Sequence, residues 1–330
     1  MGFDPKNDFM NKKLMRCALA SLVLLSACGG GGSSGAGSAP VVPATTVSLL
    51  SVALTPTLSS PEFITRSSDG YLYVTDASNN VRKISVSGGA ASSLPAVAPG
   101  AGVALSSANN LYYLANHNLN FLDQTASNES TPIYTDLDSN FAGLAFAGAS
   151  AYFSNGGAIE IINSVRVGTF YANAPNEPCC SSCSLSPAQP IGIATDGSSF
   201  YATLDSGKVL HTPLGACPSA LNASNTFTDN THLLNPKGIV VVGNTAYVVN
   251  NGTPGADDGS ISKIDLNPGA LNPVTTFMDS TSGNWPAGHV GFCDPYGIAV
   301  EPDGSYIYVT NRSACSANIA NQNTILKIKL

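Results

Sequence analysis

The chain has 330 residues, of which 43% are hydrophobic and 11% are charged, with a formal net charge of −7. This much apolar material and this little charge exclude a wholly disordered chain, because disorder requires low hydrophobicity and high charge. The acidic balance argues against a nucleic-acid partner, since contacts with phosphates need clustered Lys and Arg. The 32 Gly and 21 Pro indicate a fold rich in turns.

Residues 1–27 have the features of a bacterial export signal. Basic residues between positions 12 and 16 precede an apolar run at 17–25 that is too short to cross a bilayer of about 30 Å. The sequence Leu25-Ser26-Ala27-Cys28 that follows resembles the bacterial lipobox. The resemblance implies a lipoprotein, cut before Cys28 and held in a membrane by acyl chains such as palmitate on Cys28. A plain secretion signal and a transmembrane anchor are the alternatives.

Residues 28–44 begin with the lipidated Cys28 and continue as a Gly/Ser-rich tether, whose small residues have no side chains to pack. Gly29, rather than an acidic residue, follows Cys28. By resemblance to enterobacterial lipoprotein sorting, this favours the outer membrane. The expected location is therefore the bacterial cell envelope, with the lipid bilayer as one partner.

Residues 45–330 contain six copies of one pattern: a short apolar run, a turn with Gly, Asn or Asp, and an aromatic-rich run that ends near Asp or Asn. Such pairs of runs are typical of antiparallel hairpins. A third strand is expected after most pairs. The copies begin near Pro61, Ala101, Ala142, Pro190, Pro236 and Pro295.

Antiparallel repeats of about 40–50 residues predict a β-propeller, here all-β with six blades. The last repeat has no fourth strand behind residues 325–330, and an unassigned apolar segment lies at 47–54. We expect this N-terminal segment to supply the outer strand of the last blade, because that pairing closes the ring and removes a free sheet edge. A solenoid and a two-sheet sandwich are the alternatives.

Two of the repeats resemble a known motif. Residues 61–85, PEFITRSSDGYLYVTDASNNVRKIS, and residues 295–311, PYGIAVEPDGSYIYVTN, resemble NHL repeats. The resemblance implies the fold of TolB-like propellers, of the gluconolactonase (senescence marker protein) family and of the streptogramin lyases. It implies the fold more strongly than an activity, since one fold hosts many functions.

An Asp or Asn follows the aromatic run of every repeat. Equivalent positions in a propeller form a ring around one mouth of the channel, where these oxygens are candidates to bind Ca²⁺ or a polar ligand. The alternative is that each side chain caps the turn after its strand. The six residues are Asp76, Asn116, Asn155, Asp205, Asn250 and Asn311.

Three further candidates stand just before the inner strands of their repeats. Glu62, Lys237 and Tyr296 are expected to face the same mouth. Because they differ from one blade to another, they are better candidates for specific contacts than the repeated Asp and Asn.

The resemblance also raises an enzymatic alternative. The gluconolactonase family holds a metal with a Glu, two Asn and an Asp, and Glu62 matches the Glu. The positions that carry Asn in the family read Ala101-Gly102, Ala142-Gly143, Ile191-Gly192 and Lys237-Gly238 here, so the match is incomplete. The streptogramin lyases use a catalytic His, but the sequence shows no partner for His117 or His289. We assign no catalytic residue.

Six cysteines remain when Cys17 and Cys28 are set aside, and an even number in an exported chain indicates disulfides. Cys293 and Cys315 flank one predicted hairpin and are expected to pair. The pairing among Cys179, Cys180, Cys183 and Cys217 stays open.

The function expected from the sequence is that of a membrane-anchored lipoprotein whose propeller is a non-enzymatic binding scaffold. The expected ligand is an envelope protein, a peptide or a glycan, and no cofactor is required, with Ca²⁺ left open. The alternatives are a metal-dependent lactonase or lyase at the same mouth and a purely structural component of the envelope.

Overall fold

The structure, a computed structural model, describes residues 47–49, 52–53, 58–76, 80–94, 100–123, 130–135, 141–162, 167–171, 188–214, 226–253, 257–270, 273–282, 285, 291–312 and 323–330. The predicted signal segment and tether lie outside these residues. No helix that is long and apolar enough to cross a membrane occurs in the described part of the chain.

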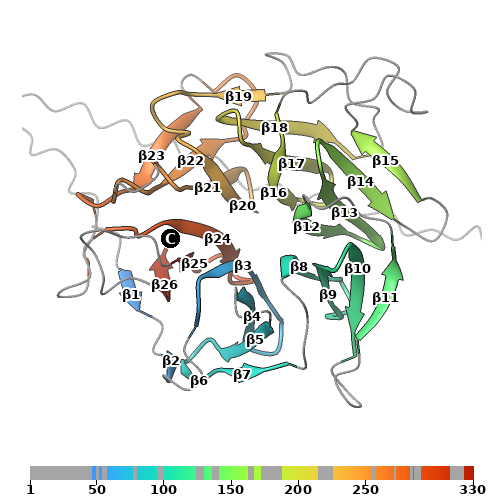
Figure 1. Cartoon of the computed structure of the whole chain (residues 1–330). Coiled ribbons are helices and arrows are strands. Elements are labelled where there is room, and N and C mark those ends of the chain that lie inside the picture. The colour runs from blue at the N-terminus through green and yellow to red at the C-terminus, as the bar shows by residue number, and fades with distance from the viewer. Residues whose placement is uncertain are drawn as a thin grey trace, which may run out of the picture. The chain divides into compact units, whose positions relative to one another are not determined.

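Six four-stranded antiparallel sheets are arranged as blades around a common centre (Figure 1). This is the predicted six-bladed propeller. The strands of each blade are given from the inner strand outward. The first blade contains β3 (Pro61–Arg66), β4 (Tyr71–Asp76), β5 (Asn80–Ser85) and β7 (Ser92–Ser93), and the second contains β8 (Gly100–Leu105), β9 (Leu111–Ala115), β10 (Asn118–Leu122) and β11 (Ser130–Tyr134). The third blade contains β12 (Phe141–Ala147), β13 (Ser150–Asn155), β14 (Ala158–Ile162) and β15 (Val167–Tyr171), and the fourth contains β16 (Pro190–Thr195), β17 (Ser199–Leu204), β18 (Lys208–Pro213) and β19 (Thr226–Thr228). The fifth blade contains β20 (Pro236–Val242), β21 (Thr245–Asn250), β22 (Ser260–Asp265) and β23 (Val274–Met278), and the last contains β24 (Pro295–Val300), β25 (Tyr306–Asn311), β26 (Thr324–Lys329) and β1 (Val47–Leu49).

The outer strand of the last blade comes from the start of the described chain. Strand β1 pairs antiparallel with β26, with Val47 opposite Ile328. The rest of the predicted segment does not continue this pairing. Residues 52–53 form β2 (Val52–Ala53), which pairs in parallel with β6 (Gly89–Ala90) beside the first blade. The predicted strand at 47–54 is therefore two short strands with different neighbours.

The hydrophobic core lies between the blades. The buried apolar residues form six clusters, and each cluster joins two neighbouring blades. Five of the six largest fully buried rings among the described residues come from the second strands, including Tyr73, Phe153 and Tyr308. Burying a side chain of this size contributes about 2–3 kcal/mol, so the aromatic-rich second runs of the repeats stabilise the contacts between blades.

The inner strands approach one another closely around the axis, and β3 contacts both β8 and β24. Five of the six have Gly at the third position. A Cβ at Gly297 would lie 2.2 Å from the carbonyl oxygen of Glu62 in the next blade, and one at Gly192 would lie 2.2 Å from that of Lys237. Only Gly permits this approach of two backbones. The first blade has Phe63 at the corresponding position.

Each inner strand also contains a β-bulge at its start. In β24, for example, the pairing with β25 skips the two residues between Pro295 and Ile298. The hydroxyl of Thr310 compensates for the lost pairing, because it accepts a hydrogen bond from the Gly297 N–H at 2.8 Å and donates one to the Glu62 carbonyl at 2.6 Å. The same hydroxyl therefore links the last blade to the first.

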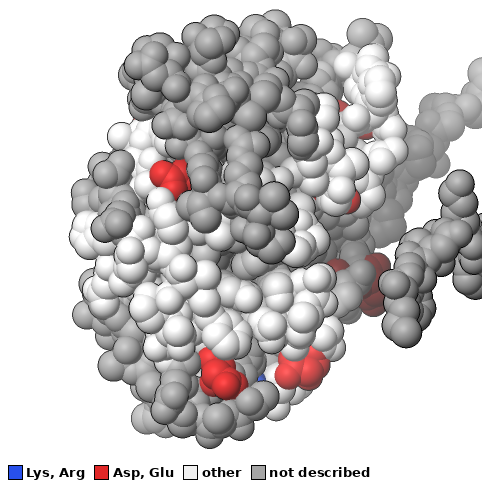
Figure 2. All heavy atoms as spheres, turned by 90° about the vertical axis from the view of Figure 1, so that its right-hand side faces the viewer, with Lys and Arg blue, Asp and Glu red and all other residues white. Residues whose placement is uncertain are grey.

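One side of the molecule shows few charged side chains among the described residues (Figure 2). In Figure 2, which shows the side of the molecule at the right of Figure 1, acidic side chains lie at separate places and Lys and Arg are almost absent. The described residues of this side form no basic surface of the kind that binds phosphates (Figure 2).

Candidate functional site

The bulges carry the second residue of each inner strand at one end of the channel. We call this end, where the inner strands begin, the first mouth. Three of the six positions are the predicted site residues and three are small or apolar. They are Glu62, Ala101, Ala142, Ile191, Lys237 and Tyr296.

Arg312 is the centre of a charged network at the first mouth. Its Nη1 lies 3.2 Å from Oε1 of Glu62, and its Nε and Nη2 lie 2.9 and 3.1 Å from the two oxygens of Asp294. The pairing of Pro295 with Asn311 places 294 and 312 side by side, and the Arg312 N–H also donates to the Asp294 carbonyl at 3.1 Å. Asn251 donates a further hydrogen bond from its amide to the Asp294 carboxylate.

Tyr296 is packed from several sides. The guanidinium of Arg312 lies 4.3 Å from the centre of its ring, and Lys237 Nζ lies 5.7 Å from it. Phe63 meets the ring edge-to-face, with centroids 5.2 Å apart. Edge-to-face pairs and cation–π contacts each contribute about 0.5–1 kcal/mol, so these contacts fix the ring in place. The structure thus brings the three predicted residues Glu62, Lys237 and Tyr296 into one cluster.

The electrostatics of the cluster follow from its partial burial. Burial raises the pKa of Glu62 above its ordinary value, although the charge of Arg312 partly offsets the effect. Burial and the neighbouring Glu62 carboxylate raise the pKa of Tyr296 to about 12. Burial and the charge of Arg312 lower the pKa of Lys237, while Asp294 and Asp205 act in the opposite direction. Lys237 makes no salt bridge with any described residue.

The predicted ring of Asp and Asn stands one strand further from the axis, at or just after the ends of the second strands. Two of its members accept hydrogen bonds from the backbone before an inner strand: Asp76 from Ser59 at 2.9 Å and Asp205 from Gln189 at 2.8 Å. These contacts are of the capping kind. Whether any ring residue also touches a ligand stays a prediction.

The other ring residues differ in environment. Asn155 is buried and donates to Glu160 at 2.7 Å, and Asn250 donates to Ser262 at 2.8 Å. Asn116 is exposed in a turn, with a φ of 52°. Asn311 is fully buried, and neither polar atom of its side chain has a hydrogen-bond partner within the described residues.

Sequence reasoning missed Arg312, Asp294 and Asn251. A signal for them exists, because Arg312 and Asn251 directly follow the ring positions Asn311 and Asn250, and Asp294 directly precedes the inner strand of the last blade. Asp294 also adopts a positive φ of 49°, a conformation that Asp and Asn tolerate better than most residues.

The donors at the first mouth do not fit a calcium site. Ca²⁺ takes six to eight oxygen ligands. Both carboxylates of the cluster, Glu62 and Asp294, are held by Arg312, and Ala101, Ala142 and Ile191 supply no side-chain oxygen. Within the described residues, no group of three or more His, Cys, Asp or Glu is placed to hold a metal ion.

The three described histidines have different surroundings. His211 lies in β18, stacked on Tyr201 with ring centroids 4.9 Å apart, and burial lowers its pKa. His232 pairs with Asp229 at 2.7 Å in the loop before β20. His117 is exposed, and His289 lies outside the described residues.

Cys293 is fully buried at the start of the last blade. Its predicted partner Cys315 lies outside the described residues, as do Cys179, Cys180, Cys183 and Cys217. The disulfide pairings therefore stay predictions.

Comparisons with known proteins show which folds the chain shares. No family model and no curated protein matches the sequence. Among solved structures, virginiamycin B lyase from Staphylococcus aureus is 14% identical with a TM-score of 0.56, and the match covers 87% of this chain and 99% of that one. A gluconolactonase from Xanthomonas campestris is 10% identical with a TM-score of 0.59, covering 87% of this chain and 90% of its own.

A third similar structure has a different role. An auxiliary nutrient binding protein from Bacteroides thetaiotaomicron is 11% identical with a TM-score of 0.60, and the match covers 86% of this chain and 76% of that one. Likeness at such low identity shows the fold and not the activity. The chain is a six-bladed β-propeller whose structural neighbours include lyases, a gluconolactonase and a binding protein.

Proposed function

We propose that this protein is a lipid-anchored component of the bacterial envelope that binds, and does not transform, an acidic peptide segment at the first mouth. The observation that supports this function most is the division of charge there. Arg312 is occupied by Glu62 and Asp294, whereas the half-buried Lys237 makes no salt bridge with a described residue. Lys237 is therefore the cation that a ligand carboxylate would meet.

The same network argues against catalysis. A general base or a nucleophile needs a partner that activates it and a position free to reach the substrate. Glu62, the residue that matches the metal ligand of the gluconolactonase family, is instead paired with Arg312. The carboxylates of the cluster are paired with Arg312 and are not free to accept a proton from a substrate. This arrangement suits the binding of a ligand better than general-base catalysis.

A peptide fits this mouth better than a glycan. Sugars are commonly held against the open face of an aromatic ring, but Arg312 lies over the ring of Tyr296 and Phe63 meets it edge-to-face. The opposite part of the mouth presents Ala101, Ala142 and Ile191, which suit apolar side chains. An acidic group next to apolar residues is a feature of a peptide segment.

The test compares Glu-rich, Lys-rich and uncharged peptides of equal length, measured by fluorescence anisotropy with the full chain. Only the acidic peptide should bind, and Lys237→Met should weaken its binding at least tenfold. Lys263→Met is the matched control, because Lys263 is exposed in β22 away from both ends of the inner strands and its loss should change nothing. Equal binding of all three peptides would contradict the proposal, and so would an unaffected Lys237→Met.

The enzymatic alternative has its own readout. A calorimetric titration with Ca²⁺ that shows stoichiometric binding, abolished by Glu62→Ala, would replace the scaffold with a metal-dependent enzyme. The anchor is tested by labelling cells with palmitate. We expect label on the chain and none on a Cys28→Ala variant, and an unlabelled wild-type chain would contradict lipidation.

A further inference from the structure

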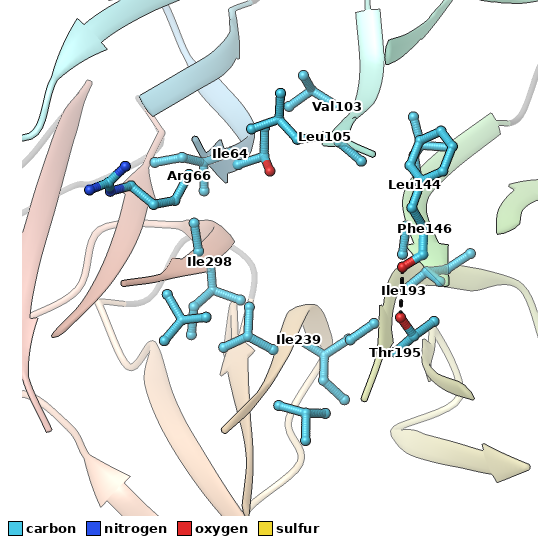
Figure 3. A pocket seen from close by; sticks show the side chains of 18 residues that line it. Ile64, Arg66, Val103, Leu105, Leu144, Phe146, Ile193, Thr195, Ile239 and Ile298 are labelled. Atoms are coloured by element: carbon cyan, nitrogen blue, oxygen red, sulfur yellow. Dashed lines mark hydrogen bonds between the residues drawn. The ribbon is translucent and has the colours of Figure 1, made fainter. Parts of the chain in front are cut away.

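The other end of the channel, where the inner strands finish, has a different chemistry. We call it the second mouth. Its wall contains the fourth to sixth residues of all six inner strands, which surround a pocket of about 250 Å³. Figure 3 shows the labelled side chains arranged around this pocket, with the guanidinium of Arg66 directed away from its centre. The deep side chains are Ile64, Val103, Leu144, Ile193, Ile239 and Ile298.

The throat of the second mouth is apolar and open to solvent. The deep aliphatic side chains are buried, whereas Leu105, Phe146, Val241 and Val300 nearer the rim are half-buried. Among the polar residues of the wall, Thr195 donates to the Phe146 carbonyl at 2.9 Å, and Arg66 is paired with Glu301 at 2.9 Å. The Nη1 atom of Arg66 is buried and has no hydrogen-bond partner within the described residues. An apolar cavity of roughly 150 Å³ is large enough to bind benzene. This larger pocket has room for an aromatic ring or a short alkyl chain.

The turns around the second mouth are acidic. Each turn connects an inner strand to the second strand of its blade, and all six lie within the described residues, at 67–70, 106–110, 148–149, 196–198, 243–244 and 301–305. They contain Asp69, Asp196, Glu301 and Asp303, and neither Lys nor Arg.

Two of these carboxylates stay ionised over a wide range of pH. Burial acts to raise the pKa of Asp196, but hydrogen bonds from the backbone of Ser198 and Ser199 hold it below its ordinary value. The hydroxyl and backbone of Ser305 lower the pKa of Asp303. Asp69, Asp196 and Asp303 are exposed, so a bound molecule can reach them.

The two mouths are separate sites. Between them lies a smaller space of about 40 Å³, lined by four of the inner-strand glycines, the deep aliphatic side chains and Phe63. A space of this size is too small for a benzene ring, which occupies cavities of roughly 150 Å³. A ring-sized ligand in the pocket of the second mouth therefore does not extend into the first mouth.

We propose that the second mouth binds a small amphiphilic cation, with an alkyl or aryl group in the apolar throat and an ammonium group at the acidic turns. The throat supplies the area for hydrophobic burial, at about 25 cal/mol for each Å². The turns supply the preference for positive charge, which acts mainly through their combined field and not through one contact. An anionic amphiphile of the same length is repelled by that field.

The experiment titrates the full chain by calorimetry with three probes of one chain length: n-hexylammonium, hexanol and hexanoate. We expect n-hexylammonium to bind at least tenfold more tightly than hexanoate, with hexanol between them. Raising the salt concentration should reduce the difference, because exposed charges are screened. Equal affinity for the three probes would reject the role of the acidic turns, and no binding of any probe would reject the site.

Variants locate the site. Val300→Trp fills the throat from its rim and should reduce hexylammonium binding at least tenfold. Asp69→Asn and Asp303→Asn should each reduce it about two- to fourfold, as expected for an exposed charge. Asp229→Asn removes an equal charge from a loop on the side of the first mouth and serves as the control, with no change expected.

The outcome is independent of the function proposed for the first mouth. Val300→Trp should leave acidic-peptide binding intact, and Lys237→Met should leave hexylammonium binding intact. If Val300→Trp unfolds the chain, the Asp→Asn variants and the order of affinity of the three probes still show whether the second mouth binds hexylammonium. Binding of hexylammonium that survives both Val300→Trp and the Asp→Asn variants would place it elsewhere and overturn the proposal.

Discussion

The two mouths of the propeller are built from the same six strands and yet differ in every physical property that decides binding. At the first mouth, Glu62, Lys237 and Tyr296 join Arg312 and Asp294 in a network of charges that contact one another. At the second mouth, mostly aliphatic side chains surround an open pocket, Arg66 is paired with Glu301, and Asp69, Asp196 and Asp303 are exposed on the turns. The difference in side-chain chemistry between the two mouths arises at the β-bulges, where the backbone of each inner strand departs from regular pairing.

A bulge separates the two chemistries along each inner strand. The residue within the bulge is released from the alternation of the strand, so Glu62, Lys237 and Tyr296 are accommodated there at the first mouth. The fourth to sixth residues of each strand follow the bulge and line the pocket of the second mouth; they are apolar except for Thr65, Arg66 and Thr195. The side-chain chemistry of the first mouth is thus set at one position of each strand, and that of the second mouth at the positions after the bulge.

The glycine layer between the mouths gives the largest expected effect. Gly297→Ala places a Cβ 2.2 Å from a backbone oxygen of the neighbouring blade, and we expect a loss of about 3 kcal/mol or more in the free energy of unfolding. Gly148→Ala is the matched control, because its Cβ meets open space and the cost is only the strain of a φ of 59°, about 1–2 kcal/mol. Urea denaturation measures both, and equal losses would contradict close packing at the axis.

Arg66→Met tests the ion pair of the second mouth. The side chains of Arg66 and Glu301 are only 10% and 13% exposed, so removal of the cation leaves a buried carboxylate with the hydroxyl of Tyr308 as its remaining partner. We expect a loss of about 2–3 kcal/mol, near the lower end for a broken buried pair. A loss below about 0.5 kcal/mol in urea denaturation would show that the pair is effectively solvated.

Arg312→Met makes the corresponding change at the first mouth. Here the side chains of Arg312 and Glu62 are 24% and 30% exposed, so water compensates for part of the lost attraction. Asp294 is only 11% exposed, but it keeps the hydrogen bond from the amide of Asn251. We expect a loss of about 1–2 kcal/mol, smaller than that of Arg66→Met. The two arginines share no partner, and the double variant should therefore show the sum of the two losses. A reversed order would contradict the stated difference in burial.

The smallest effect is a difference in pH dependence. The raised pKa of Glu62 means that the folded chain binds more protons than the unfolded chain above the ordinary value of 4.5. Its contribution to stability therefore falls as the pH rises from 4.5 through the raised pKa. At the second mouth, the lowered pKa of Asp196 acts in the opposite sense, and its contribution is lost as the pH falls below 3.8.

Stability curves of Glu62→Gln and Asp196→Asn, each subtracted from that of the wild type, display these two slopes. The Glu62 difference should decline with rising pH and the Asp196 difference should increase. Parallel curves for Glu62→Gln and the wild type would show that burial does not shift the pKa of Glu62.

Much of the fold was predictable because each repeat contains short sequence patterns that identify its strands and turns. The apolar run, the turn and the aromatic run of each copy identify the two inner strands of every blade, and β1 lies beside β26 as expected. The outermost strands were harder, since β7 is only Ser92–Ser93 and has no hydrophobic pattern. The split of residues 47–54 into β1 and β2 has no signal that a propensity argument can use.

The candidate site was predictable only in part. Glu62, Lys237 and Tyr296 occupy equivalent positions of the repeat, and their common mouth follows from that equivalence. Arg312 directly follows the ring position Asn311, but it contacts a residue 250 positions away, and that pairing has no signal in the repeat. The pocket of the second mouth could not be predicted from the sequence. An apolar pocket wall has the same composition as a hydrophobic core, so the sequence pattern does not distinguish Ile64, Leu144 and Ile298 from core residues.

The small space among the glycines at the axis limits how the second mouth exchanges its ligand. Its volume of about 40 Å³ is far below the roughly 150 Å³ that holds benzene, so a ring-sized occupant of the second mouth does not rest there. Such a ligand therefore leaves by the same side of the ring through which it entered.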